Sequence, residues 1–544
     1  MILAGTSAKK QSFFRGAAIL AATVALTKII GAIYKIPLYN LLGDDGTGHF
    51  NKAYEVYNLM LAISTAGVPV ALSCLISSAR ASGRYAQARR YNSVGLFVFT
   101  VIGVLGTAAM YIWAPQLASF MKDAEIALAL KVLSPAVLFA ALVSVLRGYS
   151  QGHNDMVPTS LSQITEVVCK MIFGLAAAWF LASQGNDLAT IAAGAIVGVT
   201  MGMGLAIPVM AIYNKRIRRL DAEDIVVDEP DSVGKTAAKI LKVSLPITVG
   251  AAASQFITFF DSRIISDTLE SVLNIEHSIA ISLYGVYSKA LALFNLPSAF
   301  ITPVAVSVVP IIAAAIAARK AGEAKKTVES SMKLTNLFAM PAAVGIAVLS
   351  KPIFISLYGS TGYEGLGPVI LTILGAASFF VCEYIITNGI LQASGHEKVS
   401  ALSLIAGGIV KLILSWKLVS LPGLNIVGAP IGTLVCYIII AAVNTTVMQL
   451  KLPEKPNLIK IIFRPFVCTA VMGAGSFAVY GLLEKFALPL LGGGRIGTII
   501  CLAVTIIVAV VIYAALVLAL KVVTREDVVL LPKGEKIAKL LRLK

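Results

Sequence analysis

The chain has 544 residues, of which 58% are hydrophobic and 13% charged, and its mean hydropathy is +0.86. This composition excludes an ordinary soluble protein, and apolar runs of about 20 residues or more recur along the chain in place of the ten-residue alternating strands of a membrane barrel. The sequence therefore predicts an all-α polytopic membrane protein. The net charge is +17, and the basic residues recur in alternate loops, as expected for loops beside an anionic leaflet. This distribution argues against a nucleic-acid partner.

Fourteen spans are predicted, at about 15–41, 53–78, 93–115, 125–148, 157–183, 188–212, 240–266, 278–315, 333–358, 366–393, 399–420, 426–450, 461–484 and 497–520. The longest hydrophilic stretch, 213–239, starts basic and turns acidic, and is predicted to be a solvated cytoplasmic linker. It separates an N-terminal lobe, 1–212, from a C-terminal lobe, 240–450. The remaining segment, 451–544, holds two more spans and a cytoplasmic tail. Basic residues follow the even-numbered spans, which predicts that both termini are cytoplasmic.

Two short motifs indicate that the lobes are copies of one another. Tyr54-Glu55-Val56-Tyr57 in span two recurs as Tyr284-Gly285-Val286-Tyr287 in span eight, and Gln151-Gly152-His153-Asn154 after span four resembles Ser394-Gly395-His396-Glu397 after span ten. Odd and even spans keep their parity, so the lobes are expected to be parallel repeats, pseudo-symmetric about an axis along the membrane normal. Prolines are expected to interrupt and kink several spans, and these are Pro69, Pro246, Pro297, Pro303, Pro310 and Pro341. Span eight, which holds three of them, is the best candidate for a bending element.

The first span carries two lysines, which are costly at bilayer depth unless they are paired or hydrated. Lys28 and Lys35 are seven residues apart and share one helix face, with Gly31 between them. One interpretation is that Lys35 extends to the interface and Lys28 pairs with a buried carboxylate. The other is that both ammonium groups line a hydrated cavity that accepts an anionic substrate.

Other charged residues fall inside later spans. The spacing of Glu166 and Lys170 predicts a local salt bridge, whereas Lys411 and Lys417 are expected to extend to the interface or contact lipid. A cavity between the lobes would be cationic and suited to phosphate or pyrophosphate. Its predicted substrate-binding residues are Lys28, Lys35, Arg263 and Lys289. The carboxylates predicted to balance this charge, or to bind a coupling ion, are Glu55, Glu166, Asp261 and Glu383.

Signals for catalysis, metals and cofactors are poor. The four histidines form no HExxH-type cluster, and the six cysteines lie inside predicted spans without a CxxC pair. Val233-Gly234-Lys235-Thr236 resembles the end of a phosphate-binding loop but lacks the upstream glycine and the preceding strand. We therefore expect no catalytic residue, no metal and no cofactor, and the sequence does not identify a coupling ion such as Na⁺ or H⁺.

Several segments are similar to the MurJ-like group (SpoVB/YtgP type) of lipid II flippases in the multidrug/oligosaccharidyl-lipid/polysaccharide exporter superfamily. They are Lys28-Ile29-Ile30-Gly31-Ala32-Ile33-Tyr34-Lys35-Ile36-Pro37, Leu41-Leu42-Gly43, Ala53-Tyr54-Glu55-Val56-Tyr57, Ser64-Thr65-Ala66-Gly67-Val68-Pro69-Val70-Ala71, Arg147-Gly148-Tyr149-Ser150-Gln151-Gly152, Pro158-Thr159 and Gln163-Ile164-Thr165-Glu166. The resemblance implies alternating access by two lobes and export of an undecaprenyl-pyrophosphate-linked glycan from the inner to the outer leaflet. It also implies that Lys28, Lys35 and Lys289 line the central cavity and that the last two spans hold the lipid tail. Asp261-Ser262-Arg263 departs from MurJ, which is uncharged there.

The resemblance leads to a non-enzymatic flippase, most simply for lipid II, in the bacterial plasma membrane. Its expected partners are the lipid-linked oligosaccharide and membrane lipids, it would act as a monomer, and it would support cell-wall synthesis, cell shape or sporulation. Alternatives are a translocase for another lipid-linked polysaccharide, of O-antigen or teichoic type, and a cation-coupled multidrug exporter of the same fold. Multidrug exporters of this superfamily commonly carry a carboxylate in the first span, where this chain has only lysines. A glycan polymerase or ligase would need larger external loops.

Overall fold

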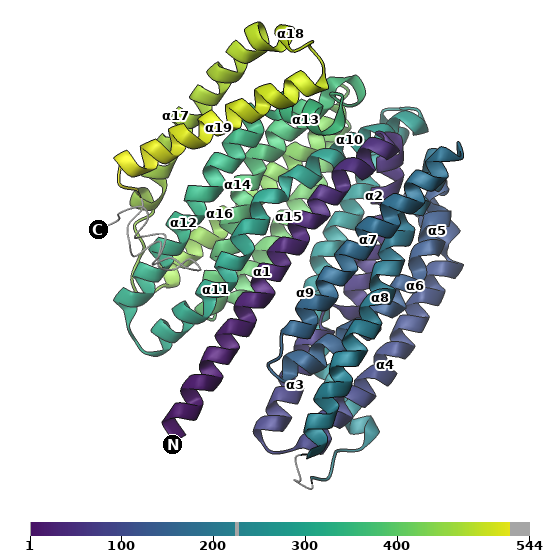
Figure 1. Ribbon diagram of the computed structural model, residues 1–544, viewed down its shortest axis with the longest axis vertical. Helices are drawn as coiled ribbons and strands as arrows, with labels where there is room; N and C mark the ends of the chain where they lie inside the picture. The colour runs from purple at the N-terminus through teal and green to yellow at the C-terminus, as the bar shows by residue number, and fades with distance from the viewer. Residues whose placement is uncertain (1, 224–227, 523–544) are drawn as a thin grey trace. The chain divides into compact units, whose positions relative to one another are not determined.

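A computed structural model describes residues 2–223 and 228–522 (Figure 1). Every regular element in these ranges is helical, and thirteen stretches within them are long and apolar enough to cross a membrane. These thirteen correspond in order to predicted spans two to fourteen, and the predicted first span, 15–41, lies within helix α1 (Ile2–Leu42). The predicted fold class, all-α and polytopic, is therefore confirmed.

Contacts between residues divide the chain into two compact units: unit 1 comprises Met1–Glu270 and Ile275–Gly285, and unit 2 comprises Ser271–Asn274 and Val286–Lys544. Unit 1 contains α1, α2 (Asp45–Thr65), α3 (Val68–Ala81), α4 (Tyr85–Ile112), α5 (Ala114–Phe120), α6 (Ala127–Gly152), α7 (Val157–Ser183), α8 (Leu188–Glu223) and α9 (Val233–Asp267). Helix α10 (His277–Phe294) begins in unit 1 and continues into unit 2. Unit 2 also contains α11 (Leu296–Ala317), α12 (Ala321–Val348), α13 (Ser350–Tyr358), α14 (Leu366–Ala393), α15 (Glu397–Val419), α16 (Gly428–Lys451), α17 (Leu458–Leu482), α18 (Leu488–Leu490) and α19 (Arg495–Ala519).

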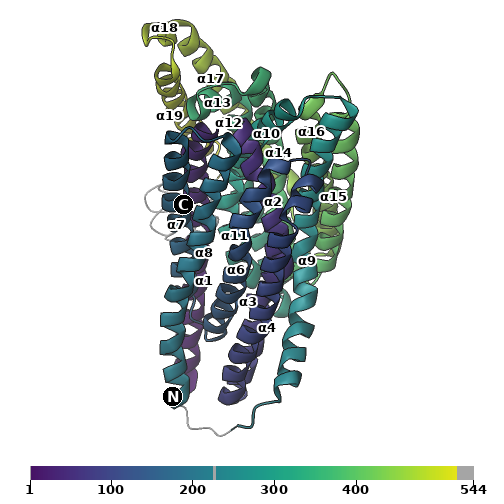
Figure 2. The same cartoon turned by 90° about the vertical axis from the view of Figure 1, so that its right-hand side faces the viewer.

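Each unit has its own apolar core. In unit 1, Leu72 and Ile76 of α3 pack against Val145 and Tyr149 of α6 in one buried cluster. In unit 2, a second cluster joins α11, α12, α14, α16 and the start of α17. Helices α15 and α16 lie side by side (Figure 2), as do α17 and α19 (Figure 1).

Four predicted spans are each broken into two helices, at matching places in the two halves of the chain. The breaks separate α2 from α3, α4 from α5, α10 from α11 and α12 from α13. Each broken helix ends three or four residues before a proline, at Pro69, Pro115, Pro297 and Pro352 respectively. A proline ring clashes with the carbonyl four residues earlier and supplies no N–H, so it can begin a helix but cannot continue one without distortion. The repeated order of breaks supports the internal repeat, and the predicted bending element, span eight, is divided at Asn295.

Other prolines do not divide their spans. Pro246, Pro303, Pro310 and Pro341 lie inside continuous helices, and their predicted role as kinks stays a prediction. In a membrane helix the carbonyl freed by a proline can be satisfied by neighbouring groups, so a proline alone does not end the helix.

Helix α9 follows the linker in the chain, yet it belongs to unit 1, where it packs against α2, α3 and α4. The Thr248 hydroxyl of α9 accepts a hydrogen bond from the backbone N–H of Gly67, at 3.1 Å, in the break between α2 and α3. A Cβ on Gly67 would lie 2.3 Å from the carbonyl oxygen of Ser244, so only glycine fits this close approach. The division into units thus differs from the predicted lobes, 1–212 and 240–450 with linker 213–239, which stay a prediction.

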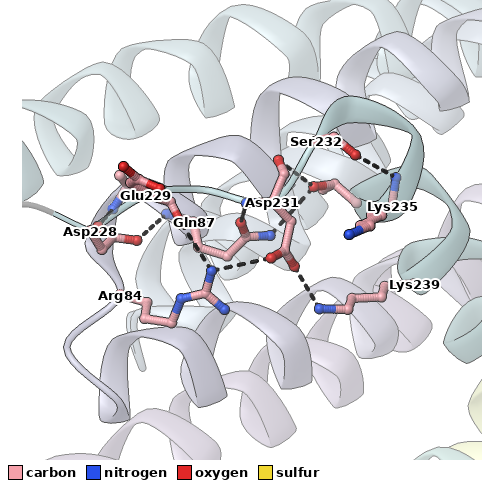
Figure 3. Close-up of polar contacts among 10 residues, drawn as sticks. Arg84, Gln87, Asp228, Glu229, Asp231, Ser232, Lys235 and Lys239 are labelled. Atoms are coloured by element: carbon pink, nitrogen blue, oxygen red, sulfur yellow. Dashed lines mark hydrogen bonds and ion pairs between the residues drawn. The ribbon is translucent and has the colours of Figure 1, made fainter.

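Helix α8 extends to Glu223 and α9 begins at Val233, so both ends of the predicted linker, 213–239, are helical. The carboxylate of Asp228 accepts the backbone N–H groups of Ala86, at 2.6 Å, and Gln87, at 3.0 Å, in the first turn of α4 (Figure 3). A carboxylate at this position satisfies two N–H groups that have no partner in the helix and interacts favourably with the helix dipole. The acidic end of the linker therefore caps α4.

Asp231 holds the same segment to α9 (Figure 3). Its carboxylate accepts hydrogen bonds from Lys239, at 2.5 Å, and Arg84, at 3.3 Å, and its backbone N–H donates to the side-chain oxygen of Gln87, at 2.6 Å. The hydrogen bonds from Lys239 and then Arg84 lower the pKa of Asp231 below its ordinary value. Asp231 thus links the start of α4 to the start of α9.

The Asp231 contact is expected to weaken in acid. A carboxylate with a lowered folded pKa stabilises the fold above its ordinary pKa of about 3.9 and loses that contribution as the pH falls through the folded value. The difference in Tm between the wild type and Asp231→Asn should therefore be constant from neutral pH down to about 5 and shrink below about 4. Glu229→Gln is the matched control. Arg84 donates to the backbone carbonyl oxygen of Glu229, which this substitution keeps. A difference in Tm that persists unchanged at lower pH would contradict this linkage.

Candidate functional site

Helix α1 presents the two predicted lysines differently. Lys28 is exposed and Lys35 is half-buried. The Lys35 ammonium lies 5.9 Å from the ring centroid of Tyr39, one turn further along α1, and interacts electrostatically with Glu55 of α2. The predicted role of Glu55 in balancing the cations stays a prediction.

A third cation approaches the same helices from α7. Lys170 donates a hydrogen bond to the Tyr54 hydroxyl at 3.0 Å, and its ammonium lies 4.3 Å from the Tyr54 ring centroid and 5.7 Å from that of Tyr34. We call Tyr34, Lys35, Tyr54, Glu55 and Lys170 the α1–α2–α7 cluster. Sequence reasoning missed Lys170 and the two tyrosines as members, although Tyr54 stands in the motif that recurs between the two halves of the chain.

The predicted salt bridge between Glu166 and Lys170 was wrong, because the fold gives each residue another partner. The Glu166 carboxylate accepts a hydrogen bond from Arg147 of α6 at 3.1 Å, and the Arg147 Nε donates to Ser162 at 2.9 Å. An arginine held by two acceptors is better oriented than a lysine one helical turn away. Glu166 therefore fastens α6 to α7 and leaves Lys170 to the tyrosines.

Arg263 lies in the last turns of α9. Its guanidinium pairs with Asp267 at 3.1 Å, the same Asp267 oxygen lies 3.1 Å from the Lys122 ammonium, and the Phe120 ring centroid is 5.3 Å from Arg263. Asp261, two residues earlier, is buried, whereas Arg263 is half-buried. Arg263 therefore shares a carboxylate with a neighbouring cation.

Sequence reasoning missed a buried polar network at the start of α2. His49 contacts Asp123 at 2.8 Å, Glu125 at 3.3 Å and Asp45 at 3.7 Å. The buried Lys52 donates to the Lys122 carbonyl at 3.2 Å. The three carboxylates come from two chain segments far apart in sequence, which is why spacing alone did not reveal the network. It fastens the start of α2 to the connection that follows α5.

In unit 2 the two predicted charged residues are both buried. The Lys289 ammonium lies 5.5 Å from the ring centroid of Tyr358, whose hydroxyl donates to the Lys289 carbonyl at 3.1 Å. Glu383 of α14 is buried, and its Oε1 has no hydrogen-bond partner among the described residues. A buried carboxylate is costly when it is charged and poorly paired, so Glu383 is suited to take up a proton or an ion.

An apolar groove of about 470 Å³ runs between α12, α13, α17 and α19. Leu337, Phe338 and Ile346 line one side of it, and Val510 and Val517 of α19 line another. The Tyr513 hydroxyl donates a hydrogen bond to the Leu337 carbonyl at 2.8 Å. The last two predicted spans thus form a groove with α12 and α13 that can accept a hydrocarbon chain.

Taken separately, the two units offer cations beside aromatic rings, in the α1–α2–α7 cluster and at Lys289. Ammonium groups held in this way bind anions and would be costly in hydrocarbon without one. The four predicted substrate-binding residues come from both units, with Lys28, Lys35 and Arg263 in unit 1 and Lys289 in unit 2. Their joint use by one substrate stays a prediction.

Comparisons with known proteins place this geometry in context. A family model described as "Polysaccharide biosynthesis protein" matches residues 13–316. The uncharacterized membrane protein YabM of Bacillus subtilis is 27% identical over 98% of this chain and 97% of its own length. Lipid II flippase MurJ of the same organism is 26% identical over 79% of this chain and 81% of its own length.

Two solved structures share the fold. A lipid II flippase MurJ in an inward closed conformation aligns with a TM-score of 0.67 over 92% of this chain and 99% of its own, at 16% identity. An inward-facing MATE-family multidrug transporter of the MOP superfamily aligns with a TM-score of 0.64 over 80% of this chain and 98% of its own, at 15% identity. The fold is therefore common to a flippase and a drug transporter.

Proposed function

Because the chain belongs to the polysaccharide biosynthesis protein family, we propose that it is a flippase for an undecaprenyl-pyrophosphate-linked glycan precursor. Lipid II is the first candidate, since one relative is a lipid II flippase. In this proposal the protein is a transporter and not an enzyme. It exports the precursor from the inner to the outer leaflet of the bacterial plasma membrane by alternating access, as a monomer with both termini in the cytoplasm. The products of this export serve cell-wall synthesis.

The observation that carries the proposal is the α1–α2–α7 cluster. A diphosphate headgroup must cross a hydrocarbon layer about 30 Å thick. Charged oxygens cannot enter that layer without compensating cations or water. The Lys35 ammonium lies 5.9 Å from the Tyr39 ring centroid, Lys170 donates to the Tyr54 hydroxyl, and Lys28 is exposed two turns before Lys35 on α1. These groups can replace the water around a diphosphate, and Lys289 offers a similar group in unit 2.

The alternative of another lipid-linked polysaccharide uses the same chemistry, because the diphosphate and the lipid are shared. The alternative of a cation-coupled multidrug exporter needs a carboxylate that exchanges a cation for a drug. In this chain Glu55 interacts with Lys35, and Glu166 is held by Arg147, so Glu383, with its unpartnered oxygen among the described residues, is the best candidate for coupling. The cations of α1 favour the flippase.

The test is translocation of fluorescent lipid II in vesicles that contain the purified protein, followed by chemical quenching of the label in the outer leaflet. The protein should speed the appearance of labelled lipid in the opposite leaflet over protein-free vesicles and over a labelled phosphatidylcholine. Undecaprenyl-pyrophosphate carrying a different glycan and a cationic dye, tested in parallel, separate the two alternatives. No acceleration of lipid II under a membrane potential, a Na⁺ gradient or a pH gradient would refute the proposal.

A further inference from the structure

Five basic side chains surround a pocket of about 400 Å³ at one end of α12, α17 and α19. They are Lys326, Lys333, Lys460, Arg464 and Lys521, and we call this the basic pocket. Among the described residues that line it, Glu329 is the only acidic one. The basic residues in alternate loops predict that this end of the helices is cytoplasmic. On the cytoplasmic side, basic pockets between membrane helices bind the phosphates of lipid headgroups.

The pocket is built from two matching helix faces. On α12, Lys326, Glu329 and Lys333 follow the spacing that places side chains on one face, and on α17, Lys460 and Arg464 do the same. Asn457 caps α17 by accepting the backbone N–H of Lys460 at 3.1 Å, so the positive end of the helix dipole also lies at the pocket. Two rows of cations therefore face one volume.

Glu329, the acidic residue among the described residues that line the pocket, has a structural partner. Glu329 accepts the backbone N–H of Asn457 at 2.8 Å and so ties α12 to the start of α17. Lys325, the neighbour of Lys326, contacts Glu454 at 3.8 Å and does not line the pocket. The basic pocket thus keeps an excess of positive charge that suits a ligand with more than one negative charge.

The apolar groove begins about one helical turn deeper on the same helices. Leu337 follows Lys333 by four residues on α12, which is roughly 6 Å along the helix axis. Val517 of α19 precedes Lys521, which lies just beyond the end of that helix, by four residues. A polar pocket for phosphate and an apolar groove for hydrocarbon therefore lie in the order that one amphiphile requires.

We propose that the basic pocket and the groove together bind one lipid with a diphosphate headgroup, as a loading site separate from the α1–α2–α7 cluster. This inference rests on the proposed function, which supplies the substrate class. Two facing rows of cations match two phosphates, and one groove matches a single polyprenyl chain. An ordinary phospholipid has one phosphate and two chains, which fits both features less well.

The test is binding of undecaprenyl diphosphate to the full chain in detergent micelles, measured by native mass spectrometry over a range of lipid concentrations. The Lys460→Ala/Arg464→Ala variant should bind about tenfold more weakly or worse, as expected when charge-assisted hydrogen bonds are lost. Lys325→Ala is the matched control and should bind like the wild type, and Lys460→Arg should retain binding. Unchanged affinity in the double variant would overturn the proposal.

Three further ligands identify the occupant. Inorganic pyrophosphate, undecaprenol and phosphatidylglycerol should each bind more weakly than undecaprenyl diphosphate. Equal binding of pyrophosphate would make the pocket a site for a soluble anion, and equal binding of phosphatidylglycerol a phospholipid site; either result overturns the proposal. Lys35→Ala should keep this binding while it translocates lipid II more slowly. Diphosphate binding without any lipid II translocation by the wild type would refute the proposed function and leave the loading site standing.

Discussion

Vesicles that contain the Lys35→Ala variant are expected to translocate lipid II about 10 to 100 times more slowly than the wild type. The substitution removes a cation that can make charge-assisted hydrogen bonds to a diphosphate, worth about 1.5–3 kcal/mol, and each 1.4 kcal/mol is about a factor of ten. Lys35 lies 5.9 Å from the centroid of the Tyr39 ring and interacts electrostatically with Glu55, so its ammonium already has polar and aromatic neighbours. The initial rate of translocation is the measurement.

Two controls make the Lys35 result specific. Lys35→Arg keeps the charge and should recover most of the rate, whereas Lys417→Ala removes an exposed lysine in the last turn of α15 and should leave the rate unchanged. If Lys35 and Glu55 act as a pair, Glu55→Gln should harm transport less in the Lys35→Ala background than in the wild type. A Lys35→Ala variant that transports at the wild-type rate would remove this lysine from the site.

The largest expected effect on stability comes from Gly285→Ala. A Cβ at this position would lie 1.8 Å from the Asp44 carbonyl oxygen and 3.1 Å from the Gly48 backbone nitrogen. Both atoms belong to the backbone around the start of α2, so neither can move aside as a flexible side chain would. Overpacking of this kind costs about 1–3 kcal/mol and sometimes more. The Tm of the purified protein should fall by several degrees.

Gly250→Ala is the control for Gly285→Ala. Gly250 lies in α9, and an added Cβ there meets nothing within 4 Å. Alanine is favoured over glycine within a helix by about 1 kcal/mol, so helix propensity alone predicts that both substitutions raise the Tm. Opposite shifts for the two variants would isolate the close contact at Gly285. A Tm for Gly285→Ala at or above that of Gly250→Ala would show that the contact is not tight in solution.

The same glycine shows how the two copies of the repeated motif diverged. Glu55 in Tyr54-Glu55-Val56-Tyr57 corresponds to Gly285 in Tyr284-Gly285-Val286-Tyr287. The first copy carries the carboxylate that interacts with Lys35, and the second carries no side chain because the start of α2 occupies that space. One position therefore serves electrostatics in one copy and packing in the other.

The predicted membrane spans followed the helices closely because length and hydropathy alone decide whether a helix can cross a bilayer. The breaks at Pro69 and Pro297 were also predictable, since proline acts on its own helix. Pairing across helices was not. Arg147 reaches Glu166 from 19 residues away, and Lys170 reaches Tyr54 from 116 residues away. The i,i+4 spacing of Glu166 and Lys170 suggested a local pair, and a better-oriented arginine on a neighbouring helix took its place.

The basic pocket illustrates a second limit of sequence reasoning. Lys326 and Lys460 were interpreted only as members of basic loops that set the orientation of the chain. Their convergence depends on α12 and α17 packing side by side, which no local pattern reports. The contacts of Asp228 show the same limit. An acidic stretch predicts solvent exposure, whereas in the fold the N–H groups at the start of α4 bind the Asp228 carboxylate.

The position of α9 has a consequence for how this protein can be divided. By chain order α9 opens the second half, but its side chains fill the space beside α2, α3 and α4, and its Thr248 completes the hydrogen bonding at Gly67. A cut in the connection after α8 would thus yield two pieces that each lack a surface the other supplies. Such pieces should recover the native arrangement only when made together, as mutually dependent fragments.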